Sequence, residues 1–346
     1  MRLLRMSVLF VVTLGVGALA QTAGAQSSAP SAPKAAPAIK KPTALRTPWG
    51  RPDLAGTWDF RTVTPMERPA EFAGKATLTE KEAAEYARRT VEDRNADKRH
   101  DTTVRRIVNG TAETEDVALA YNDFWWDRGT KVVGTRRTSL IVDPPDGRIP
   151  ALTPKAQQRL AAEDVLRERP AEGPEDRSIG ERCLMGFNSG PPMAPGGYNQ
   201  NVQIVQHPNY VALLNEMIHN TRIIPLDGRP LVDVPQWAGE SRGHWEGDTL
   251  VIETTNFHQN TSLRGSSRNL RLVERLRRVD ADSLLYEFTV DDPTTWTKPW
   301  TAQVPMVKTE GLIYEYACHE ANYAMFGILS GARAVEKKGA GKSSPR

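Results

Sequence analysis

The chain lacks most of the features that would define a chemistry at once. Its 346 residues hold only two cysteines and no HExxH, CxxC, P-loop or G-x-S-x-G motif, so no familiar zinc, redox, nucleotide or serine-hydrolase site is recognisable. No apolar run beyond the N-terminus is long enough to cross a bilayer. We therefore expect a soluble globular protein, with no metal, no cofactor and no membrane span.

Neither sign of charge dominates the chain. The formal net charge is +3, and the excess sits at the ends, in Arg2 and Arg5 and in the segments 26–48 and 335–346. Residues 49–334 are therefore net acidic, which argues against a nucleic-acid partner. A small-molecule ligand is the partner we expect; the sequence points to no protein partner.

Residues 1–25 have the pattern of a secretory signal peptide. Arg2 and Arg5 precede a mostly apolar run over 8–20, and Ala23-Gly24-Ala25 is a cleavage site. An uncleaved membrane anchor is the alternative. Residues 26–48, rich in Ala, Pro, Ser and Lys, are expected to be a disordered linker. The sequence thus predicts a periplasmic or secreted protein.

In an exported chain, Cys183 and Cys318 are expected to form a disulfide. Two separate thiols are one alternative. The other is that Cys318 serves as a ligand or nucleophile beside His319.

The globular domain is expected over 49–334, followed by a disordered basic tail over 335–346. Helices decorate residues 77–170: Thr79 and Glu82 form a capping box for a helix to about residue 95, and Pro154 begins a second helix that Pro170 closes.

Residues 199–317 read as a β meander. Strands are expected at 202–206, 210–217, 222–226, 272–279, 284–291, 300–308 and 312–316, with shorter ones near 56–63 and 138–142. The fold class is therefore mainly β, an antiparallel meander that closes into a barrel, with the helix-containing N-terminal half packed on it.

The clearest hairpin is residues 239–258, in which Gly247-Asp248 forms a two-residue turn. This turn pairs Glu246 with Thr249 and Arg242 with Glu253. One face then carries Trp245, Leu250 and Ile252, while Arg242 and Glu253 share the other.

Five stretches resemble a large, mostly hypothetical family of exported bacterial proteins. They are PDLAGTW (52–58), RRTSLIVDPPDGRIPALTP (136–154), EMIHNTRIIPLDGRP (216–230), WEGDTLVIETTNF (245–257) and DPTTWTKPWT (292–301). The resemblance implies export and assigns no catalytic residue. The second half is also similar to lipocalin-type (calycin) barrels, which implies binding of small apolar or aromatic molecules and, in some members, their isomerisation, hydration or dehydration.

The candidate catalytic residues are Glu253, Glu216 and His219. Glu216 and His219 share a face only on a helix; on a strand their odd spacing separates them. Arg242 and Glu253 form either a solvated ion pair or part of a cavity lining.

The candidate ligand-binding residues are Arg222, Arg242, Arg275 and Tyr286. Arg275 and Arg277 face Phe288 and Tyr286 if Val279 pairs with Leu284, whereas a three-residue turn would flip that register. Such a cluster would hold a carboxylate or phenolate.

The function expected is binding of a small, partly aromatic molecule, with acid–base turnover of the isomerase, hydratase or lyase type. A non-catalytic binding module and a structural envelope protein are the alternatives.

Overall fold

A computed structural model describes residues 45–340 of the chain, except 96, 98–104, 109–110, 115–121, 168, 233, 262, 267 and 321. The expected signal peptide, most of the expected linker and the last six residues of the expected tail lie outside the described residues.

The structure is mainly β. Its strands are β1 (Gly56–Asp59), β2 (Arg105–Val108), β3 (Thr111–Thr114), β4 (Ile141–Asp143), β5 (Asn201–His207), β6 (Tyr210–Asn215), β7 (Thr221–Pro225), β8 (Glu240–Glu246), β9 (Thr249–Thr255), β10 (Arg271–Arg278), β11 (Ser283–Asp291) and β12 (Trp300–Thr309). Its α-helices are α1 (Glu80–Asp93), α2 (Pro154–Arg167) and α3 (Tyr323–Ala340).

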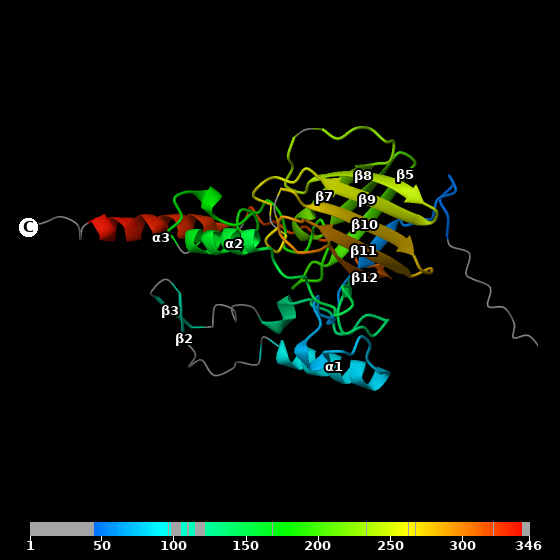
Figure 1. The fold of residues 1–346 in the computed structure, drawn as a ribbon, viewed down its shortest axis with the longest axis horizontal. Coiled ribbons are helices and arrows are strands. Elements are labelled where there is room, and N and C mark those ends of the chain that lie inside the picture. Colours follow the sequence, from blue (N-terminus) through cyan, green and yellow to red (C-terminus); the bar gives the residue numbers. More distant parts are fainter. Residues whose placement is uncertain are drawn as a thin grey trace, which may run out of the picture. The chain divides into compact units, whose positions relative to one another are not determined.

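One ten-stranded antiparallel sheet holds all strands except β2 and β3, which form a separate hairpin. The order is β7-β6-β5-β1-β12-β11-β10-β9-β8, and β4 pairs with β12. Figure 1 shows β8 to β12 side by side, as expected for a meander. The exception to sequential order is β1, which lies between β5 and β12 and joins the two halves of the sheet.

One face of the sheet is buried because its strands alternate apolar and polar residues. On β11, Leu284, Tyr286, Phe288 and Val290 are all buried, while their neighbours along the strand are partly exposed. They stand opposite four buried residues of β12, namely Met306, Val304, Ala302 and Trp300. These cross-strand pairs form the centre of the core.

The β8–β9 hairpin has the predicted register. Glu246 pairs with Thr249 and Arg242 pairs with Glu253, and Gly247 adopts the positive φ (56°) that this tight turn requires. Leu250 and Ile252 are fully buried, and Trp245 packs against the core. The two-residue turn and the alternation of polar and apolar residues therefore both predicted correctly that Trp245, Leu250 and Ile252 face the core.

The sheet ends at β7 and β8, so closure into a barrel is not confirmed. β7 stops at Pro225, which has no backbone N–H to donate. The edges approach closely at Gly243, where a Cβ atom would lie 2.7 Å from Leu226 Cδ2 and 2.9 Å from Ile224 Cγ2. Side chains of the β7 end, rather than a ladder of hydrogen bonds, thus fill the seam at this point.

Two of the helices begin where the sequence predicts. Thr79 caps α1, with a reciprocal pair of hydrogen bonds to Glu82, and Pro154 begins α2. Helix α3 was not predicted. It includes residues 335–340 of the expected tail, which are rich in helix-forming alanine, lysine and glutamate.

Two strand predictions are wrong. Residues 312–316 alternate like a strand but form none, and β12, which precedes them, already has β1 and β11 as its neighbours. In the β10–β11 hairpin, Arg278 rather than Val279 pairs with Leu284. That shift by one residue moves every predicted partner to the other face.

Candidate functional site

The buried face of the sheet carries a polar network. Glu274 of β10 accepts hydrogen bonds from the Arg222 Nη1 and Nη2 atoms, each at 2.7 Å, and from the Tyr286 hydroxyl at 2.7 Å. None of the three residues is more than 5% exposed. A buried carboxylate is thus held by a two-pronged ion pair and a phenol.

The ion pair leaves one atom without a partner among the described residues, the buried Arg222 Nε. Burial lowers the pKa of Arg222, but the charge and the hydrogen bonds of Glu274 together outweigh this effect, and the net shift is upward. Burial, reinforced by Glu274, raises the pKa of Tyr286 well above 10. The Tyr286 hydroxyl also accepts the Met193 N–H at 3.0 Å. Because both Glu274 oxygens have partners and Tyr286 is kept neutral, the network serves to hold the core together.

A glycine- and proline-rich segment, residues 186–197, adjoins this network. Its Met193 is fully buried in the core and binds Tyr286, and Asn220 Nδ2 donates to Gly190 O at 3.3 Å. On its other side the same segment presents Gly190, Pro191 and Pro192 to a pocket. The segment is thus a wall between the core of the sheet and that pocket.

The pocket has a volume of about 370 Å³, within the range of small-molecule sites. We call it the aromatic pocket. Its lining residues are Ser178, Ile179, Gly180, Met185, Gly186, Phe187, Gly190, Pro191, Pro192, Tyr198, Met217, Ile218, Thr261, Leu263, Tyr316 and Cys318. Most of them are apolar, and none is Asp, Glu, Lys, Arg or His.

Aromatic rings from three segments meet at this pocket. Tyr198 packs edge-on against Phe187 (centroids 5.4 Å apart) and stacks with Tyr316 (6.0 Å). Glycine makes room for the rings: a Cβ at Gly196 would lie 2.6 Å from the Phe187 ring. The glycine content of this segment therefore has a packing reason.

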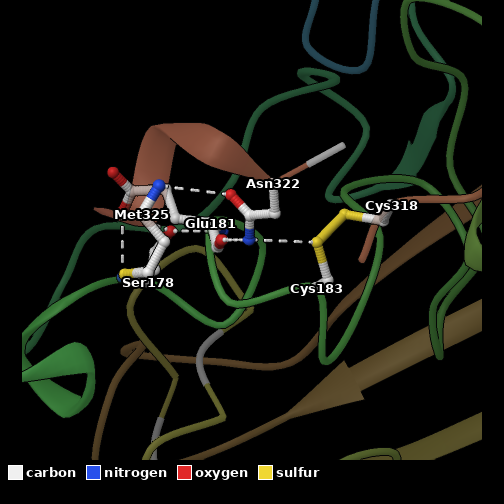
Figure 2. The surroundings of a disulfide bond; sticks show 6 residues. All are labelled: Ser178, Glu181, Cys183, Cys318, Asn322 and Met325. Atoms are coloured by element: carbon white, nitrogen blue, oxygen red, sulfur yellow. Dashed lines mark hydrogen bonds between the residues drawn. A yellow bond between two sulfur atoms is a disulfide. The ribbon is translucent and has the colours of Figure 1, made fainter. Parts of the chain in front are cut away.

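The disulfide forms part of the pocket wall. Cys183 and Cys318 are bonded, with Cα atoms 5.7 Å apart, which confirms the predicted bridge. Figure 2 shows Asn322 beside it: its Nδ2 atom donates to Cys183 Sγ (3.4 Å) and to Glu181 O (2.8 Å). Since residues 310–317 have no regular secondary structure, the bridge fixes the Tyr316 side of the pocket.

Two other hollows among the described residues are more polar. A groove of about 410 Å³ lies between β7 and the start of β8, and its Arg242 and Glu240 are tied to each other and to the loop 229–232. A cleft of about 580 Å³ is lined by four arginines and five carboxylates, together with Leu166, Pro170, Ser178, Ile179, Gln259, Asn260 and Ser266. The cleft has no aromatic residue in its lining, and the groove has one, Trp237.

Arg242 and Glu253 lie opposite each other, but only Arg242 lines a hollow, the groove between β7 and β8. Glu253 is 44% exposed and pairs with Arg271 at 2.6 Å, and its neighbour Ile252 is in the core. The cavity-lining arrangement is therefore wrong for Glu253, because its side chain lies on the partly exposed face of the sheet, next to Arg271 of β10. Arg242 instead donates to Arg229 O and Pro230 O and so anchors a loop.

Glu216 and His219 do not form a site together. Glu216 is buried, accepts from Asn201 Nδ2 (2.8 Å) and the Tyr314 N–H (3.4 Å), and lies just before the 3-10 turn Met217–His219. His219 is exposed. The role of Glu216 in the structure is to tie the strand ends to the segment that carries Tyr316.

Of the expected ligand-binding residues, Arg222 and Tyr286 are joined through Glu274, and Arg222 also lines the groove between β7 and β8 together with Arg242. Arg275 lies on the outer face and pairs with Glu246, because the β10–β11 register differs from the predicted one. Glu274, which joins Arg222 to Tyr286, was missed. The sequence feature that could have identified Glu274 is its position between Leu272 and Leu276, on the apolar side of β10.

Tyr198 and Tyr316 were also missed, because Tyr198 lies in an irregular segment and the alternation around Tyr316 predicted a strand instead of a pocket wall. No helix within the described ranges is long and apolar enough to span a membrane. No protein-family model, curated protein or solved structure matches the chain. The resemblance to exported bacterial proteins therefore stays a prediction, and function rests on the site itself.

Proposed function

We propose that the protein is a periplasmic or secreted binding module for a small, partly aromatic molecule, which it holds in the aromatic pocket. The observation that carries the proposal is the convergence of Phe187, Tyr198 and Tyr316 on one apolar hollow of small-molecule size. Aromatic side chains bind other rings through offset and edge-to-face contacts.

Binding without turnover is the better supported form of this proposal. Acid–base catalysis requires a group of suitable pKa within hydrogen-bond reach of the reacting atom. The expected catalytic residues Glu253, Glu216 and His219 do not line the pocket, and the buried Glu274 is committed to Arg222 and Tyr286.

The compartment is part of the proposal. A disulfide that joins residues 135 positions apart is typical of a chain that folds outside the reducing cytosol. The signal-like N-terminus supports the same location.

Ligand-observed NMR with a library of small aromatic compounds tests the proposal. Phe187→Ala and Tyr316→Ala should each abolish the saturation transfer of binders seen with the oxidised wild type. Phe124→Ala is the matched control, since Phe124 is 84% exposed and does not line the pocket. Equal signals from all four proteins, or no binders at all, would refute this function.

A further inference from the structure

We infer that the ligand of the aromatic pocket is uncharged, and that the pocket discriminates against the ionised form of an otherwise identical molecule. This inference rests on the proposed function and specifies its ligand class. It follows from the lining, which contains no Asp, Glu, Lys, Arg or His. A charged group buried there would lose water without gaining an ionic partner.

Two hydroxyl groups of the lining, those of Ser178 and Thr261, already donate to other groups of the protein. The Ser178 hydroxyl donates to Glu181 Oε2 at 2.8 Å, and the Thr261 hydroxyl donates to Trp237 O at 2.9 Å. Neither O–H is therefore available to stabilise an anion. The two hydroxyl oxygens can still accept a hydrogen bond, and this suits a neutral ligand that carries an N–H or O–H group.

Three charged groups next to the lining are directed elsewhere. Glu216 precedes the lining residue Met217, but its two oxygens accept from Asn201 and Tyr314. Glu181 pairs with Arg177, and the Arg182 guanidinium lies over the Trp237 ring, 5.7 Å from its centroid. These three groups therefore offer no free counter-ion to an ionic ligand in the pocket.

A cation is the strongest alternative, because aromatic faces attract positive charge. However, the three rings do not form an aromatic cage. Tyr198 and Tyr316 stack on each other, with an angle of 24° between their planes, and Phe187 meets Tyr198 at 89°. One stacked pair and one edge-on ring leave single faces and edges for a flat neutral ligand, and they do not form a cage of several faces around one ammonium group.

The test uses two pairs of probes that differ in charge and little in shape. One pair is naphthalene-2-carboxamide and naphthalene-2-carboxylate, and the other is 2-naphthylmethanol and 2-naphthylmethylammonium. Affinities are measured at pH 7 by ligand-observed NMR titration of the full, oxidised chain. We expect the neutral member of each pair to bind about 100-fold or more tightly than its ion, since an unpaired buried ion costs several kilocalories per mole.

Phe187→Ala separates this inference from the function on which it rests. Binding of the neutral probes should fall in that variant and persist in Phe124→Ala. If an ion binds as tightly as its neutral partner and Phe187→Ala weakens both, the charge selectivity is wrong while the pocket stands. If no probe binds, or if Phe187→Ala changes nothing, both proposals are overturned.

Discussion

Replacing Glu274 by glutamine tests the energetics of the buried face. Glutamine has nearly the same size, but it removes the charge and one of the two acceptor oxygens that face Arg222. The guanidinium, held by two 2.7 Å hydrogen bonds in a site with no exposed surface on Glu274, is left as an unpaired buried charge. Breaking such a pair costs about 3–5 kcal/mol.

Glu253→Gln is the matched control, on the neighbouring strand. Its partner Arg271 lies at a similar distance, 2.6 Å, but both side chains are about half exposed. Exposed pairs contribute about 0–1 kcal/mol. The same chemical change should therefore have a small effect on the outer face and a large one on the inner face.

Urea unfolding of the oxidised proteins, followed by tryptophan fluorescence, measures both changes. We expect the free energy of unfolding to fall by about 3–5 kcal/mol for Glu274→Gln and by less than about 1 kcal/mol for Glu253→Gln. Equal losses in the two variants would refute the reasoning. They would mean that water reaches the Arg222 site and screens it.

Three further outcomes are expected. At pH 8, Tyr286→Phe should lower the free energy of unfolding by about 1.5–3 kcal/mol. Because the pKa of Tyr286 in the folded protein is raised above 10, the wild type loses this extra stability as the pH rises past 10, and the urea curves of the two proteins should converge above pH 10. A difference in stability that does not change with pH would contradict this prediction. The double variant Cys183→Ser/Cys318→Ser should have a free energy of unfolding about 4–5 kcal/mol lower than that of the oxidised protein in the chain-entropy model, and it should bind aromatic probes more weakly in NMR titrations. Unchanged binding would show that the disulfide does not shape the pocket. Gly243→Ala should cost about 1–3 kcal/mol by overpacking the seam, whereas Gly134→Ala, where a Cβ meets nothing within 4 Å, should be tolerated; equal melting temperatures would argue against a tight seam.

The fold was predictable from sequence where local chemistry determines it. The Gly247-Asp248 turn leaves only one register for β8 and β9, and Thr79 with Glu82 marks the start of α1. The β10–β11 connection contains no such two-residue turn, and alternation alone did not distinguish two registers one residue apart.

The candidate site was less predictable because it depends on contacts between distant segments. Glu274 is an acid on an apolar strand face, and burial becomes possible only through Arg222, 52 residues earlier. Tyr198 and Tyr316 lie in irregular chain, and only the disulfide and Glu216 bring Tyr316 to the pocket. Alternation places Glu274 on the apolar face of β10 but does not identify its partners, and no pattern in the sequence links Tyr198 to Tyr316.

The position of β1 has a consequence for how the chain folds. This four-residue strand is made early in synthesis, yet its partners are β5, near residue 203, and β12, near residue 308. The hairpins of β5–β7 and β8–β12 need only nearby partners, so they can form first. Insertion of β1 then requires two long loop closures, and ordering of loops this long slows folding. We therefore expect the joining of the two half-sheets by β1 to be the late, rate-limiting step.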